Sequence, residues 1–270
     1  MKRYKMLVFY GILIFLLLFV AAIASHIVPY DPYAQNLEMA LKAPDDIHWL
    51  GTDRYGRDMF SRVLVGAQTT IFSALLLLSL ISAFGIFIGI ISGYYGGWID
   101  TVLMRITDVF LAFPEMIFAV AVAAVLGGGI LNAAAALALV AWTKYARLSR
   151  GLVFTVRHMP YIVAARMNGT KNLGIMSKHI LPNIAGTMFV TAALDMGTII
   201  MELAGLSFLG LGAMPPMAEW GAMMNNGRSM IQTAPWIVIS PGVAIFLTVA
   251  IFNLFGDSVR DCLDPKQMKG

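Results

Sequence analysis

The chain has 270 residues, of which 59% are hydrophobic and only 13% are charged. Soluble globular domains carry about 25% charged residues, so this composition excludes an ordinary soluble protein and indicates one membrane-embedded domain. The formal net charge of +4 is not a sign of nucleic-acid binding, because the basic residues cluster in one part of the chain, where membrane orientation explains them.

Six apolar segments are predicted to cross the membrane as helices, since about 20 apolar residues span a bilayer. We expect these spans at residues 6–28, 69–91, 107–126, 130–146, 184–206 and 236–255. Basic residues precede the first span and keep the N-terminus inside. An even number of spans then returns the C-terminus to the same side. The sequence therefore predicts an all-α, six-helix polytopic membrane protein with both termini cytoplasmic.

The chain divides into two parts by polarity. Residues 1–66 hold the first helix, which is too long for a signal-peptide core, and a polar external segment in which acids outnumber bases. Residues 67–265 form a core of five helices, with a cytoplasmic loop at 147–183 and an external segment at 207–235. The alanine-rich span at 130–146 is expected to be central, because small residues let membrane helices pack closely. The single cysteine, Cys262, excludes an internal disulfide.

The segment from Lys144 to Pro182 is strongly basic, with seven Lys and Arg residues, two His and no Asp or Glu. Each Lys or Arg at the bilayer centre costs about 2.5–3.5 kcal/mol, so we expect a cytoplasmic loop here. Gly169 can adopt a backbone conformation that other residues resist, and a proline cannot continue a helix. The predicted order is a short helix, a turn at Gly169 and a second short helix that stops at Pro182.

This spacing resembles the cytoplasmic coupling loop of ABC importer permeases. That loop reads Glu-Ala-Ala, three residues, Gly, nine residues, Ile, one residue and Leu-Pro; here Val163 replaces the Glu and His179 replaces the Ile. The resemblance implies docking on an ATP-hydrolysing subunit through Ala164, Ala165, Arg166, Gly169, Lys171, Leu181 and Pro182. The alternative is an ordinary positive-inside loop without a docking role.

Other motifs resemble the peptide and nickel branch of these permeases: Gly51–Asp58, Leu206–Gly212, Glu219–Gly221 and Phe252–Pro265. Gln68 departs from this pattern, where the subfamily often has Arg. The resemblance implies a type I ABC importer permease of the "C" kind in the cytoplasmic membrane. It also implies a second permease, two ATP-binding subunits and an external solute-binding protein as partners.

The chain is not expected to be an enzyme by itself. No lysine follows glycine in a phosphate-binding G-x-x-x-x-G-K-[ST] pattern, so ATP would be used by partner subunits and no cofactor by this chain. The four histidines show no metal-ligand spacing, and no nucleophile–base pair is evident. The external methionines suit either a soft metal or packing, and packing is favoured because no His or Cys accompanies them.

Two intramembrane acids, Asp195 and Glu202, lie seven residues apart and so share one helix face. Such acids usually face a bundle interior or an aqueous cavity. Together with Met196 they are candidates for a cation-attracting pathway, and the alternative is a polar contact that fixes helix packing. Arg105 and Asp108, three residues apart near the inner end of the third span, are expected to form a structural ion pair.

The substrate is the least determined property. Residues 195–197 and 218–223 resemble the nickel branch somewhat more than the dipeptide branch, so nickel or a metal chelate is the expected cargo and dipeptides or oligopeptides are the alternative. Two readings from other classes stay open. One is a secondary transporter that uses an ion gradient through Asp195 and Glu202, and the other is a non-transporting membrane scaffold.

Overall fold

The computed structural model describes residues 2–263, and within that range regular structure is helical apart from one isolated bridge between Thr52 and Asp58. The all-α prediction is therefore confirmed. The helices are α1 (Lys2–Ile27), α2 (Met59–Tyr95), α3 (Gly97–Leu111), α4 (Glu115–Val125), α5 (Ile130–Val156), α6 (Pro160–Met167), α7 (Asn172–Ile175), α8 (Leu181–Phe208), α9 (Trp220–Gly227) and α10 (Trp236–Leu263). Short 3₁₀ turns lie at Leu37–Met39 and Arg228–Met230, and a π-helical turn at Met176–Ile180 joins α7 to α8.

Four helical stretches are long and apolar enough to cross a membrane: Tyr4–Ile27, Met59–Tyr95, Asn172–Phe208 and Trp236–Cys262. The bent pair α3–α4 would add a fifth if it counts as one span. α5 lacks a window of comparable apolarity, because three basic residues occupy its second half. The six-span count and the cytoplasmic placement of both termini therefore stay predictions.

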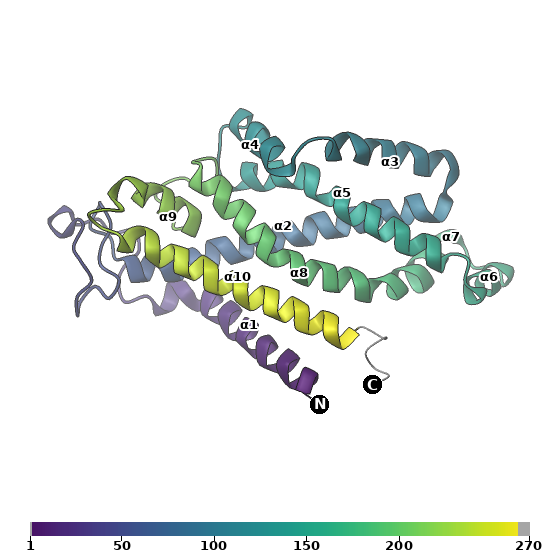
Figure 1. The fold of residues 1–270 in the computed structure, drawn as a ribbon, viewed down its shortest axis with the longest axis horizontal. Coiled ribbons are helices and arrows are strands. Elements are labelled where there is room, and N and C mark those ends of the chain that lie inside the picture. The colour runs from purple at the N-terminus through teal and green to yellow at the C-terminus, as the bar shows by residue number, and fades with distance from the viewer. Residues whose placement is uncertain (1, 264–270) are drawn as a thin grey trace.

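The long helices run between two ends of the molecule (Figure 1). One end carries α9 and the irregular segment between α1 and α2, whereas α6 and α7 lie at the other. The N-terminal end of α1 and the C-terminal end of α10 both point away from α9. This arrangement separates the segment around Gly169 from the external-type segments by the length of the bundle.

α5 is an interior helix, in agreement with its alanine content, and it packs against α2, α3, α4 and α8. Its closest approach is to a stripe of glycines on α2, namely Gly85, Gly89 and Gly93. A Cβ at Gly85 would lie 2.4 Å from the Trp142 carbonyl oxygen, and one at Gly89 would lie 1.9 Å from Ser149 Oγ. The four-residue spacing of these glycines allows the two backbones to touch.

The structure corrects three predicted elements. The third span is not one helix, because the chain bends by 83° between α3 and α4, where Pro114 caps the N-terminus of α4. The basic segment is not a loop from Lys144 onward, because α5 continues as a helix to Val156. Pro182 does not end a helix: it lies in the first turn of α8, where a missing N–H costs little.

Candidate functional site

The turn at Gly169 is built as the sequence predicted. α6 begins at Pro160, which suits a first helical position, and ends before Gly169, whose φ is +77°. The Gly169 amide donates to the Arg166 carbonyl at 3.0 Å, and the Thr170 amide donates to the Ala165 carbonyl at 3.1 Å. A left-handed residue with these bonds is a common helix C-cap, and it redirects the chain into α7.

The α6–α7 segment (residues 157–180) is attached to the end of α2. Ile162 and Ile175 are fully buried. The Tyr94 hydroxyl of α2 donates to Asn172 Oδ1 at 2.8 Å, and Arg157 Nη1 donates to the Gly93 carbonyl at 2.8 Å. One side of this segment is therefore fixed to the bundle, so its other side can transmit a displacement to α2 and, through the π-helical turn, to α8.

The opposite side of the α6–α7 segment is exposed and apolar. Met167 is 84% exposed and Leu173 is 76% exposed, and they flank the Gly169 turn. Contiguous exposed apolar side chains rimmed by polar groups mark interaction surfaces. Of the residues that the resemblance assigns to docking, Ala165 is half-buried, whereas Ala164, Arg166, Gly169, Lys171, Leu181 and Pro182 are exposed.

A second candidate site is a cavity of about 50 Å³ between α4, α5 and α8. Asp195 and Glu202 both line it, so they share a helix face as predicted. Four residues that the sequence interpretation did not assign to this site complete its polar lining: Glu115, Lys144, Tyr145 and Thr198. Met196, which was expected beside them, is buried and is not among the lining residues.

The polar groups in this cavity are unevenly paired. Lys144 Nζ lies 2.6 Å from Asp195 Oδ1, and the Tyr145 hydroxyl donates to Asp195 Oδ2 at 2.9 Å. Glu202 Oε2 is buried without a hydrogen-bond partner among the described residues. Three carboxyl groups and one lysine line the cavity. This excess of acidic over basic groups favours cationic over anionic ligands. The residues that the sequence analysis missed come from α4, α5 and α8. The one sequence signal for them was Lys144, a basic residue that follows the alanine-rich part of α5.

The ion pairs of α3 differ from the expected one. Asp108 pairs with Arg147 of α5 and not with Arg105, for which no ion pair is found among residues 2–263. A second pair links Asp100 of α3 to Arg150 of α5, with Nη2 and Oδ2 2.5 Å apart. Because α3 lies along α5, its acids meet the basic stripe of α5, and this contact replaces the local i,i+3 pair.

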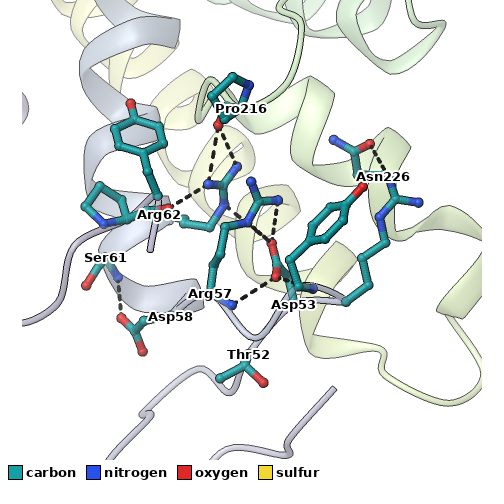
Figure 2. A network of polar contacts seen from close by, with 12 residues as sticks. Thr52, Asp53, Arg57, Asp58, Ser61, Arg62, Pro216 and Asn226 are labelled. Carbon is teal, nitrogen blue, oxygen red and sulfur yellow. Dashed lines mark hydrogen bonds and ion pairs between the residues drawn. The ribbon is translucent and has the colours of Figure 1, made fainter. Parts of the chain in front are cut away.

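The other end of the molecule holds a buried ion network (Figure 2). Arg57 Nε donates to Asp53 Oδ2 at 2.6 Å, and Arg62 Nη1 donates to the Pro32 carbonyl at 2.7 Å. The guanidinium of Arg62 also reaches the Pro216 carbonyl at 3.4 Å. This network joins the segment before α2 to the segment after α8. Arg62 therefore acts as a structural clamp, with Asp53 and Arg57 of the motif at residues 51–58 beside it, a role that the sequence pattern alone did not reveal.

The acid of the motif at residues 219–221 is likewise structural. Glu219 is buried and caps α9, accepting from the Gly221 and Ala222 amides at 2.9 and 2.8 Å. The Thr70 hydroxyl of α2 donates to it at 3.1 Å. Burial raises the pKa of the Glu219 carboxyl, and these hydrogen bonds act in the opposite direction. The residue ties α9 to α2.

Comparison with known proteins agrees with this architecture. Residues 85–269 match the family described as "binding-protein-dependent transport system inner membrane component". The chain is 42% identical over 259 residues to the glutathione transport system permease protein GsiD of Pectobacterium atrosepticum, covering 95% of this chain and 85% of that protein. It is also 42% identical to the dipeptide transport system permease protein DppC of Alkalihalophilus pseudofirmus, over 257 residues that cover 95% and 84%.

A solved structure shows a more distant likeness. It is the MetNI methionine ABC transporter in an inward-facing conformation, with 19% identity and a TM-score of 0.49. The aligned part covers 72% of this chain and 94% of that one.

Proposed function

The chain belongs to the family of binding-protein-dependent transport system inner membrane components, and we propose that it forms, with a second permease, the pathway of an ATP-driven peptide importer. As a member of that family it is a multi-pass permease subunit in the cytoplasmic membrane. The observation that carries the proposal is 42% identity over 95% of the chain to permeases of glutathione and dipeptide transport systems.

Peptides are the proposed cargo. The relatives are named for glutathione and dipeptides, which favours the peptide alternative over the nickel or metal chelate expected from the sequence. The cavity chemistry agrees with this choice. Among residues 2–263 no group of three His, Cys, Asp or Glu side chains could hold a metal ion. A carboxylate-rich hollow instead suits the ammonium group of a peptide.

The pathway role is proposed for the cavity between α4, α5 and α8. Glu202 has an unpaired buried oxygen there, and Asp195 is engaged by a lysine whose side chain is 60% exposed and so can move away. A peptide ammonium can therefore compete with Lys144 for Asp195. The rival assignment is a contact that only fixes α5 against α8, and it predicts loss of assembly when Asp195 is neutralised.

The proposed protein partners rest on two features of the chain: its sequence has no phosphate-binding loop, and one side of the α6–α7 segment is exposed. Its sequence contains no phosphate-binding loop, so two separate ATP-binding subunits are proposed to supply the energy. They would dock on the exposed side of the α6–α7 segment, where Met167 and Leu173 flank the Gly169 turn. A solute-binding protein would deliver cargo at the opposite end, near α9.

The proposal is tested by uptake into proteoliposomes that hold the complex with its partner subunits and binding protein. Labelled dipeptide, glutathione and nickel are supplied separately, each with and without internal ATP. We expect ATP-dependent uptake of peptide. Nickel uptake without peptide uptake would overturn the cargo, uptake driven by a proton or sodium gradient without ATP would indicate a secondary transporter, and no uptake by an intact complex would indicate a scaffold.

A further inference from the structure

A cavity of about 140 Å³ lies beside the start of α2, away from both sites described above. Its lining comes from residues 29–30, 46–47 and 49, and from Asp58 and Phe60 at the start of α2. The apolar stretch of α1 ends at Ile27 and that of α2 begins at Met59. The cavity therefore lies at the level where two apolar helices leave the bilayer, which is where aromatic side chains are enriched in membrane proteins.

The lining combines three aromatic rings, Tyr30, Trp49 and Phe60, with the carboxylates of Asp46 and Asp58. The Trp49 and Phe60 rings meet edge to face, with centroids 5.0 Å apart. Aromatic faces attract cations, and aromatic cages are a common way to bind substituted ammonium groups. Neither Lys nor Arg is among the lining residues that the structure describes, and the basic side chain that contacts these carboxylates is His48, which bonds to Asp58.

Asp58 is a preorganised acceptor on this lining. Its side chain is buried, and its oxygens accept from His48 Nδ1 at 2.9 Å and from the Ser61 amide at 2.8 Å. A carboxylate has about four acceptor positions, so these two bonds orient the group and leave positions for a ligand. The His48 ring pairs with Asp58 as an ion pair only if it is protonated, whereas Asp46, the second acid of the lining, has no ion pair among residues 2–263.

The basic residues of the external segment are engaged elsewhere. Lys42 Nζ lies 2.7 Å from Asp45 Oδ2. Arg57 and Arg62 belong to the buried network around Asp53, and Arg54 Nη2 reaches Asn226 Oδ1 at 3.5 Å. Apart from His48, which contacts Asp58, the basic side chains described for residues 29–62 have their contacts elsewhere, so the cavity receives no Lys or Arg from its own segment.

Size and donor chemistry limit what that cation can be. A cavity of about 150 Å³ is known to hold one benzene molecule, so about 140 Å³ admits a substituted ammonium head but not a whole dipeptide. A bare metal ion would need more than two carboxylates and a set of soft or oxygen ligands that the rings cannot supply. We propose that this cavity binds an organic ammonium group head first, with the rest of the ligand outside.

Such a group has two sources at this level: an aminoalkyl lipid headgroup of the outer leaflet, or the amino end of a peptide. The probe that represents both is tetramethylammonium, titrated onto the complete transporter in nanodiscs of phosphatidylglycerol alone, without ATP. Sodium chloride at equal ionic strength is the reference. Binding is read as the saturation-transfer NMR signal of the probe's methyl protons, so the result does not depend on transport or on the cargo assignment.

We expect saturable binding that Trp49→Leu and Asp46→Asn each weaken at least five-fold. Both side chains are exposed, and Trp49 is 63% exposed, so neither change disturbs the core. The matched controls are Trp98→Leu, an exposed tryptophan in the first turn of α3, and Glu38→Gln, an exposed acid of the segment between α1 and α2. Absence of saturable binding, or equal binding by Trp49→Leu, would overturn the proposal.

Competition then identifies the source. Phosphatidylethanolamine added to the nanodisc displaces the probe if the lipid headgroup is the ligand. Dialanine displaces it, and N-acetyl-dialanine does not, if the amino end of a peptide is the ligand. Failure of both phosphatidylethanolamine and dialanine to compete would overturn the proposal even if the probe itself binds.

Discussion

Lys144 Nζ of α5 lies 2.6 Å from Asp195 Oδ1 of α8, at the edge of a cavity that two further carboxyl groups line. The lysine side chain is 60% exposed and the aspartate side chain is 15% exposed. The carboxylate is thus held within the bundle, whereas its counter-ion is the more accessible member of the pair.

The first prediction concerns that pair. Asp195→Asn keeps an acceptor for the Tyr145 hydroxyl, so we expect the complex to assemble normally. Peptide uptake should fall at least ten-fold, because the site loses the charge that competes for an ammonium. Uptake and assembly are measured on the same purified complex, with Glu38→Gln as the control. Loss of assembly, with no folded complex to assay, would instead favour a packing role.

The second prediction concerns the turn in the α6–α7 segment. At a φ of +77°, Gly169→Val forces a β-branched residue into the left-handed region at a cost of about 1–2 kcal/mol. No heavy atom lies within 4 Å of an added Cβ, so the backbone alone is affected. We expect normal insertion but ATP hydrolysis without matching uptake. Gly169→Asn is the matched control, because Asn tolerates this region, and normal import by Gly169→Val would contradict the docking role.

The third prediction concerns the glycine stripe between α2 and α5. A Cβ at Gly89 would lie 2.3 Å from the Ala146 carbonyl as well as close to Ser149 Oγ. Gly89→Ala should therefore lower stability by about 1–3 kcal/mol through overpacking. Gly151→Ala on α5 meets nothing within 4 Å and should be neutral or slightly stabilising. Thermal unfolding in detergent distinguishes the two, and equal midpoints would show that the helices can separate at no cost.

The fourth prediction concerns the buried network at the external-type end. Arg62 is buried and donates to carbonyl oxygens from two distant segments. Arg62→Met leaves these acceptors and part of the Asp53 charge without a partner, so we expect a loss of about 3–5 kcal/mol. Arg105→Met is the control, since that side chain is exposed and no ion pair of it is found within residues 2–263. Limited proteolysis between α1 and α2 should increase only in Arg62→Met, and similar rates in both variants would exclude the clamp.

Several features could be read directly from the sequence because they depend on neighbouring residues. Composition and apolar stretches identified a helical membrane protein. The left-handed turn followed from Gly169, and the interior position of α5 followed from its alanines. The shared face of Asp195 and Glu202 followed from their spacing on one helix. Each of these properties is set within a few helical turns.

Other features were decided only by how the helices pack. Asp108 pairs with Arg147 across 39 residues, and Lys144 reaches Asp195 across 51. These partners depend on the rotation and register of α3, α5 and α8, which glycine contacts on a neighbouring helix help to set. The 83° bend between α3 and α4 was not predicted, and α4 packs on α5 beyond it. The amino-acid sequence alone determines which residues carry charge, whereas tertiary packing determines their partners, because an ion pair forms between the charges that the backbone brings within reach.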